Sequence, residues 1–216
     1  MKKLFLTTLL CTIFIPAFMQ QDPEAKKILD QAAEKTKSFK TIQVDYELKV
    51  TDRKENTNSS SKGKIIIKGN KYRLEAPETV VYFDGKTMWT YNEDIKEVTI
   101  TEPDMQDEDF LSNPAKILTW YNRDFKYRYD RKTQQDGTEV YEIDLFPNKL
   151  DQPYSRIKLF INTGDLLLHT VKSFGKDGID YSIHLENYVT DSDLSDSLFT
   201  FDPAKHKKVE IVDMRL

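Results

Sequence analysis

Cysteine is almost absent from this chain of 216 residues, because the single Cys11 lies in an apolar N-terminal stretch. The rest of the chain therefore has no thiol for a disulfide or for nucleophilic chemistry. Glycine is also scarce, with 7 residues, and no glycine-rich loop precedes a helical pattern to hold a phosphate group. No Gly-x-Ser-x-Gly elbow is present. These absences remove the motifs of several common enzyme classes.

Histidine is limited to His169, His184 and His206. The first two fall in strands that we expect to be neighbours, and Glu186 follows His184 on the same strand face. Two imidazoles and a carboxylate could bind zinc, but isolated strand histidines are more often surface or half-buried residues. No carboxylate pair stands out by its spacing as an acid–base dyad. We therefore expect no catalytic residue, no metal, no cofactor and no enzymatic activity.

Positive charge does not dominate either. The chain has 32 basic and 36 acidic residues, and removing Lys2 and Lys3 leaves 30 basic residues and a net charge of −6. No basic stripe with interleaved aromatics is present, so we expect no nucleic-acid partner. Aromatic residues are numerous for so polar a chain, with 11 Tyr, 12 Phe and 2 Trp. They must lie in a core or gather in a ligand site.

The N-terminus has the pattern of a targeting segment. Lys2 and Lys3 precede an apolar run from Leu4 to Phe18, and polarity begins at Gln20. This pattern predicts a signal peptide over residues 1–19, cleaved near Met19, followed by a single domain over residues 20–216. Met19 fits the small-residue cleavage pattern poorly, so an uncleaved anchor is the alternative.

The remaining chain reads as one helix followed by many strands. Asp22 and Pro23 predict a helix start, and Ile28, Leu29, Ala32 and Ala33 give it one apolar face. Residues 42–50 alternate strictly between apolar and polar, which is typical of a strand with one wet face. Residues 52–62 are too polar to pack and predict a loop. About eleven short strands without crossover helices predict a mainly β fold, an incomplete, half-open antiparallel barrel with an α-helical lid.

Residues 80–101 predict three strands of a meander. Asp84-Gly85 is a two-residue turn signal that would set Val80 beside Trp89 and Tyr82 beside Thr87. Further along, residues 103–121 predict two short helices, the second with Pro114 in its first turn. Short helices that interrupt a β chain usually cover an open end of a sheet. We expect this lid to contribute Phe110, Ile117, Leu118 and Trp120.

The predicted neighbouring strands carry more apolar side chains than a half-open sheet requires. They fill an ordinary core, or they line an apolar cavity that the lid does not fill and that accepts acyl chains. The cavity candidates are Tyr46, Leu48, Ile67, Tyr72, Leu74, Val80, Tyr82, Trp89 and Tyr91.

Residues 84–91 read Asp-Gly-Lys-Thr-Met-Trp-Thr-Tyr, residues 113–118 read Asn-Pro-Ala-Lys-Ile-Leu, and residues 199–213 begin with Phe-Thr-Phe-Asp-Pro. These three segments together resemble the signature, the lid segment and the closing motif of the LolA family of periplasmic carriers of outer-membrane lipoproteins. The resemblance implies a half barrel that shields lipoprotein acyl chains between the two membranes and makes or breaks no bond. It implies an inner-membrane ABC exporter as donor and an outer-membrane acceptor of unknown identity as partners. We expect a monomer.

One departure from the family concerns the closing of the lid. The family commonly has an arginine at the end of the second strand that binds the lid backbone, whereas Lys68 stands there in this chain. Lysine keeps the charge but lacks the planar fork of donors, so we expect Lys68 to form a weaker lid clasp. Leu74 replaces a family tryptophan and makes the cavity wall less bulky.

Two other functions stay open on the sequence. The same half barrel could serve as a sensor or scaffold that binds a lipoprotein or lipid without carrying it onward. A periplasmic hydrolase that uses His169 or His184 is the enzymatic alternative.

Overall fold

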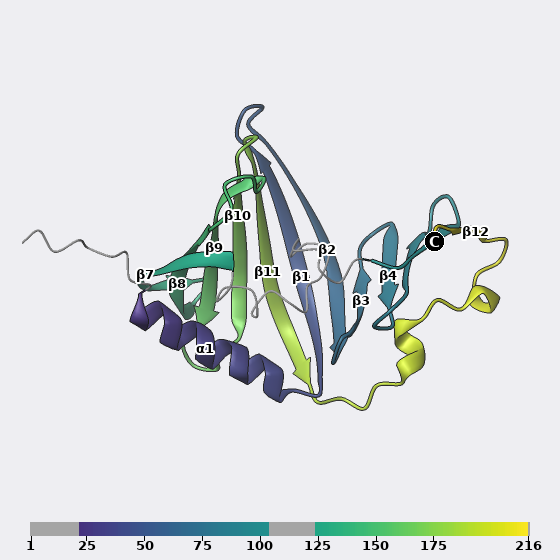
Figure 1. Cartoon of the computed structure of the whole chain (residues 1–216), viewed down its shortest axis with the longest axis horizontal. Helices are drawn as coiled ribbons and strands as arrows, with labels where there is room; N and C mark the ends of the chain where they lie inside the picture. Colours follow the sequence, from purple (N-terminus) through teal and green to yellow (C-terminus); the bar gives the residue numbers. More distant parts are fainter. Residues whose placement is uncertain (1–21, 104–123, 216) are drawn as a thin grey trace, which may run out of the picture.

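The computed structural model describes residues 22–103 and 124–215. Its strands form one twelve-stranded sheet (Figure 1). The strands are β1 (Thr41–Asp52), β2 (Thr57–Lys68), β3 (Lys71–Glu75), β4 (Thr79–Phe83), β5 (Met88–Asn92), β6 (Glu97–Thr101), β7 (Phe125–Gln135), β8 (Thr138–Pro147), β9 (Tyr154–Asn162), β10 (Leu168–Gly175), β11 (Ile179–Thr190) and β12 (Glu210–Asp213).

The sheet is open. Its strand order is β12-β6-β5-β4-β3-β2-β1-β11-β10-β9-β8-β7, so β12 and β7 are its two edges and do not pair with each other. β12 pairs with β6 in parallel, and the other neighbouring strands pair in antiparallel fashion. This arrangement confirms the mainly β, half-open antiparallel sheet that the sequence predicts, with one strand more than expected.

Helix α1 (Pro23–Ser38) starts where the sequence predicts. The Asp22 carboxylate caps it by accepting hydrogen bonds from the backbone N–H groups of Glu24 and Ala25, at 2.9 and 3.1 Å. This carboxylate also accepts a bond from the backbone of Tyr129 in β7, which fixes the helix to the sheet. Burial alone would raise the pKa of Asp22, but these backbone hydrogen bonds outweigh burial and lower it. No helix within the described ranges is long and apolar enough to cross a bilayer.

One face of the sheet curves around α1. Figure 1 shows α1 lying across β7, β8, β9 and β10. The apolar face of the helix packs against side chains from these four strands in a single buried cluster. Because side chains from four successive strands converge on one helix, this face is the concave one. We call it the inner face and the opposite one the outer face. Ile183 and Leu185 of β11 continue the inner face toward β1.

The long β1–β2 hairpin corrects the sequence interpretation. Residues 57–62, which the sequence assigns to a polar loop, form the first half of β2 and pair with residues 47–52 of β1. Both faces of this first half of β2 are open to solvent, so its sequence lacks the alternation of apolar and polar residues that would mark a strand. Backbone pairing with β1, which is itself paired on its other side with β11, satisfies the ladder without any buried side chain.

The Asp84-Gly85 turn also differs from the prediction. Phe83 pairs with Met88 and Tyr82 pairs with Trp89, so the connection is longer than a two-residue turn and the register moves by two positions. The Asp84 carboxylate causes this, because it accepts hydrogen bonds from the N–H groups of Lys86 and Thr87. A shift of two leaves every side chain on the face that the predicted pairing gave it.

The chain after β11 covers the outer face of β4–β6. Two short 3-10 helices, η2 (Asp196–Phe199) and η3 (Pro203–Lys205), lead to β12 at the sheet edge, as the yellow segment in Figure 1 shows. Phe201, between them, packs against Tyr82 and Tyr91 with ring centroids 5.9 and 5.3 Å apart. The His206 ring stacks on Phe201 at 4.6 Å.

The outer face of β7–β9 buries charged side chains beside Phe160. Lys158 lies between Glu142 and Asp144, and the Asp144 side chain is fully buried. Arg128 and Arg156 contact Asp144 at 3.0 and 3.3 Å and cover the cluster with their long side chains.

Candidate functional site

The inner face at β1, β2 and β3 carries the apolar surface that the sequence predicts. The ladders place Tyr46 opposite Gly63, and Ile65 opposite Leu74. The surface combines buried side chains with half-buried ones, and we call it the inner apolar surface. Its members are Val44, Tyr46, Leu48, Ile65, Ile67, Leu74, Ile183 and Leu185.

Tyr46 is held in place by the absence of a side chain at Gly63. A Cβ atom on Gly63 would lie 2.6 Å from the Tyr46 ring and 2.0 Å from the backbone oxygen of Glu75. The Tyr46 hydroxyl donates a hydrogen bond to that same Glu75 oxygen, at 3.1 Å. Burial raises the pKa of Tyr46, so the phenol stays protonated and keeps its donor. Glycine at this position is therefore required by the packing of the aromatic wall.

The nine cavity candidates from the sequence do not line one surface. Tyr46, Leu48, Ile67, Tyr72 and Leu74 lie on the inner face. Val80, Tyr82, Trp89 and Tyr91 lie on the outer face, because Val80 pairs with Glu75 and Tyr82 pairs with Arg73.

These four outer residues pack with the C-terminal chain. Tyr82 and Tyr91 form a buried cluster with Phe201, and Val80 and Trp89 pack against it half-buried. The Arg73 guanidinium lies 5.1 Å from the centre of the Tyr82 ring. The expectation that all nine residues share one lining is therefore wrong for these four.

Val81 and Phe83 are the inner-face residues of β4 that sequence reasoning missed. They pair with Leu74 and Tyr72, and the rings of Phe83 and Tyr72 have centroids 5.1 Å apart. The run of four apolar residues at positions 80–83 was the available signal, because an uninterrupted apolar run marks a strand covered on both faces.

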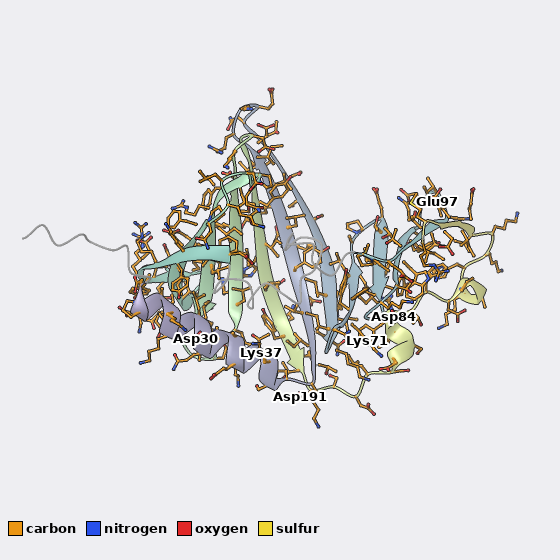
Figure 2. All side chains as sticks on the ribbon, in the orientation of Figure 1. Asp30, Lys37, Lys71, Asp84, Glu97 and Asp191 are labelled. Atoms are coloured by element: carbon orange, nitrogen blue, oxygen red, sulfur yellow. The ribbon has the colours of Figure 1, made fainter. Side chains whose placement is uncertain are left out.

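Lys68 contacts the C-terminal chain. Its ammonium donates hydrogen bonds to the backbone oxygen of Leu194 and to the Asp196 carboxylate, at 2.6 and 2.7 Å. Lys71 binds the other oxygen of Asp196 at 2.6 Å, and Figure 2 shows Lys71 beside this segment. The hydrogen bonds from Lys68 and Lys71 lower the pKa of Asp196 to about 2. The predicted lid residues Phe110, Ile117, Leu118 and Trp120 lie outside the described residues, so a contact between Lys68 and the lid stays a prediction.

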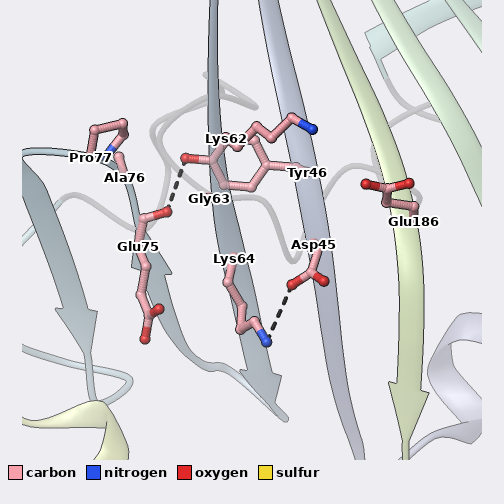
Figure 3. Close-up of a pocket in the computed structure, with 9 residues that line it drawn as sticks. All are labelled: Asp45, Tyr46, Lys62, Gly63, Lys64, Glu75, Ala76, Pro77 and Glu186. Carbon is pink, nitrogen blue, oxygen red and sulfur yellow. Dashed lines mark hydrogen bonds and ion pairs between the residues drawn. The ribbon is translucent and has the colours of Figure 1, made fainter.

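A groove of about 420 Å³ opens where β3 ends beside β2 (Figure 3). Its walls carry the carboxylates of Asp45, Glu75 and Glu186 and the ammonium groups of Lys62 and Lys64. Lys64 and Asp45 form an ion pair at 3.2 Å across it. Tyr46, Gly63, Ala76 and Pro77 complete the lining. Because charged groups of both signs reach the groove, it suits water or a polar chain better than hydrocarbon.

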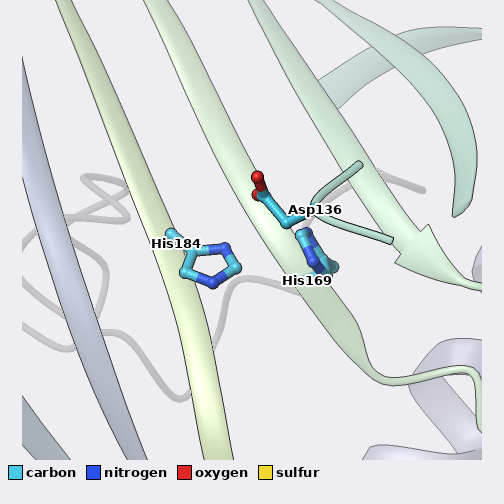
Figure 4. A group of neighbouring side chains, drawn as sticks. All are labelled: Asp136, His169 and His184. Atoms are coloured by element: carbon cyan, nitrogen blue, oxygen red, sulfur yellow. The ribbon is translucent and has the colours of Figure 1, made fainter. Parts of the chain in front are cut away.

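Three side chains outside the inner apolar surface could hold a metal ion. Asp136, His169 and His184 offer ligand atoms that all lie within 4.8 Å of one another (Figure 4). Burial and the neighbouring His184 lower the pKa of His169. The carboxylate differs from the sequence interpretation, which paired the histidines with Glu186.

Comparison with known proteins concerns the family and the fold of the chain. The family model described as outer membrane lipoprotein carrier protein LolA matches residues 37–202. An outer-membrane lipoprotein carrier protein from Haemophilus influenzae (strain PittEE) is 29% identical over 157 residues, which cover 71% of each chain. The protein of the same name from Legionella pneumophila (strain Corby) is 23% identical over 208 residues, covering 95% of this chain and 96% of its own.

A solved structure supports the fold alone. The crystal structure of an uncharacterized conserved protein from Thermus thermophilus has a TM-score of 0.57 at 13% identity, covering 88% of this chain and 99% of that one. The family match spans most of the described sheet, from the end of α1 to the residue before η3. The chain belongs to the LolA family of outer membrane lipoprotein carrier proteins.

Proposed function

We propose that the inner apolar surface of this lipoprotein carrier shields the acyl chains of lipoproteins. The observation that carries the proposal is the half-buried state of Leu48, Ile67, Leu74, Ile183 and Leu185, which share one face of a curved sheet. Each methylene that an acyl chain buries against such a surface gains about 0.8 kcal/mol.

The division of the inner face supports this role. Over β7–β10 the inner face is filled by α1, whose apolar side chains are buried there. Over β1–β3 the same face carries the half-buried Leu48, Ile67 and Leu74 beside buried side chains. Hydrocarbon has no directional bonding requirement, so a surface without converging polar groups can hold it and release it without breaking hydrogen bonds.

Carriers of the LolA family are periplasmic, and we propose the corresponding route for this chain. Residues 1–19 would act as a cleaved signal peptide, and residues 20–216 would form one carrier domain. An inner-membrane ABC exporter would load the lipoprotein, and an outer-membrane acceptor would receive it. The support for these partners is family membership, and direction would follow from affinity that rises from donor to acceptor.

A matched pair of substitutions on β1 tests the binding surface. Leu48 lies on the inner face, and Lys49 is the next residue on the outer face of the same strand. Leu48→Glu places a carboxylate against the hydrocarbon at a cost of several kcal/mol. We expect it to lower lipoprotein release from spheroplasts at least tenfold, whereas Lys49→Glu leaves release unchanged.

Gentle extraction from the native envelope, followed by mass spectrometry, provides the second readout. We expect acylated lipoprotein to copurify with the wild-type chain and with Lys49→Glu, and to be lost from Leu48→Glu. Equal release and equal copurification by two folded variants would contradict the assignment of this surface. Binding without onward transfer to outer membranes would favour the sensor function.

A further inference from the structure

A β-bulge brings two histidines to the same face of the sheet. Leu168 of β10 pairs with Ile161 and Thr170 pairs with Phe160, so His169 is the extra residue between two successive pairs. Leu168 and Val171 both lie in the inner cluster, although three positions separate them. The residues between them, His169 and Thr170, are therefore both directed to the outer side, which strict alternation forbids.

The neighbouring strand places the second imidazole opposite this bulge. His184 of β11 pairs with Thr170, and the rings of His169 and His184 have centroids 4.6 Å apart. Asp136 reaches the same place from the turn between β7 and β8, where its backbone takes a φ of 49° (Figure 4). Three separate elements thus converge on one spot.

The buried hydroxyl of Thr170 orients both rings. Its Oγ1 lies 2.9 Å from His169 Nδ1 and 3.3 Å from His184 Nδ1. A threonine oxygen has two lone pairs and can accept an N–H from each ring. Both imidazoles would then carry their proton on Nδ1 and present the lone pair of Nε2, the form in which histidine binds metals.

We propose that Asp136, His169 and His184 form a binding site for a divalent transition-metal ion of the zinc type. Two neutral imidazoles and one carboxylate are a donor set that zinc accepts, with water in the fourth position. Thr170 supplies the hydrogen bonds that hold the ligating rings in place.

Metal binding would require a local adjustment of the three side chains. Ligands of a tetrahedral zinc ion lie roughly 3.3 Å apart, since each bond is about 2 Å long. One ring nitrogen of each histidine and a carboxylate oxygen of Asp136 already lie within 4.8 Å of one another. Asp136 is exposed on a turn, so its carboxylate can rotate toward the rings without disturbing packed residues.

The site is separate from the proposed acyl-chain surface. His184 lies on the outer face of β11, between the inner-face residues Ile183 and Leu185. A bound ion would connect β10, β11 and the β7–β8 turn on the side of the sheet away from the cargo. It would stabilise the frame without contacting the lipid.

Titration of the purified, chelator-treated and desalted full chain with Zn²⁺ alone, followed by calorimetry, tests the site. We expect one saturable site per chain. His169→Gln and His184→Gln should each remove it, and Asp136→Asn should weaken it, since asparagine tolerates the same backbone conformation. His206→Gln is the matched control, because His206 stacks on Phe201 near the other end of the sheet.

The Thr170→Val substitution tests whether the Thr170 hydroxyl orients the two imidazole rings or whether the side chain only fills buried space. It keeps the shape of the side chain and removes the hydroxyl, and we expect a loss of about 10–100-fold in Zn²⁺ affinity. In histidine side-chain NMR, Zn²⁺ should shift Nε2 of His169 and His184 and leave His206 unchanged. No saturable binding by the wild type, or undiminished binding by the folded His169→Gln/His184→Gln double variant, would overturn the proposal.

Discussion

Replacing Lys158 by methionine tests whether paired charges hold the β7–β9 part of the sheet. The ammonium of Lys158 lies 2.8 Å from carboxylate oxygens of both Asp130 and Glu142, and 3.7 Å from one of Asp144. The side chains of Lys158, Glu142 and Asp144 are 11%, 6% and 0% exposed. Methionine keeps most of the volume and removes the charge.

The expected magnitude follows from the charges that remain. Removing one partner of a buried ion pair costs roughly 3–5 kcal/mol, because the other charge stays buried without compensation. Here Arg128 and Arg156 still contact Asp144, so we expect the lower end, about 3 kcal/mol in the free energy of unfolding. For a domain of this size that loss corresponds to a melting temperature lower by roughly 6–12 °C.

Urea unfolding at pH 7, followed by circular dichroism, measures the loss. Lys172→Met is the control, because Lys172 lies directly opposite Lys158 in β10. Its ammonium sits 5.1 Å from the centre of the Phe160 ring, a contact worth about 0.5–1 kcal/mol. Equal losses in the two variants, or a Lys158→Met loss below about 1 kcal/mol, would refute the reasoning.

The same comparison has a pH dependence with a defined sign. Burial alone would lower the pKa of Lys158, but its hydrogen bonds to Asp130 and Glu142 outweigh burial and raise it. The stability that charged Lys158 contributes is therefore present below the ordinary lysine pKa, and it is lost as the pH rises through the raised pKa of Lys158. The hydrogen bond from Lys158 lowers the pKa of Asp130. The stability contributed by the Lys158–Asp130 ion pair is therefore lost as the pH falls below about 4. The gap between wild type and Lys158→Met should be widest between these limits.

Two further predictions concern the inner wall and the C-terminal chain. Gly63→Ala should lower the free energy of unfolding by roughly 1–3 kcal/mol or more, because the new Cβ would lie 2.0 Å from the backbone oxygen of Glu75. Gly164→Ala, whose nearest neighbour is a flexible side-chain atom at 3.3 Å, should change it little in the same urea experiment. Asp196→Asn should speed backbone hydrogen exchange over residues 196–201, since Asp196 binds two lysines that hold this segment. Its folded pKa of about 2 places the loss of this contact between pH 4 and pH 2, and unchanged exchange across that range would contradict it.

Local signals predicted the elements of this fold well. Asp22 and Pro23 marked the start of α1, and the alternation at residues 42–50 marked β1. Each of these signals depends on residues that are close together in the sequence. A cap bonds to backbone groups two or three residues away, and the side chains of a strand alternate between its two faces. The open antiparallel sheet followed from counting such strands without crossover helices.

The candidate site was predicted only in part, because register decides which face a side chain occupies. In β4 the even-numbered and the odd-numbered residues from 80 to 83 are all apolar. The sequence pattern could therefore not say whether Tyr82 or Phe83 is directed inward. The pairing of Tyr82 with Arg73 settled it and moved four aromatic or aliphatic candidates to the outer face. A change of one residue in register would have reversed every assignment.

The sequence by itself determined that the chain forms a helix followed by an open antiparallel sheet with excess apolar side chains, because these properties depend on neighbours along the chain. Only the tertiary structure decided which of those side chains share the inner face, and that the segment around Phe201 covers the outer face. Only the bulge at His169 placed two imidazoles beside Asp136, since an extra residue in one strand changes side-chain direction without leaving a mark in composition or period.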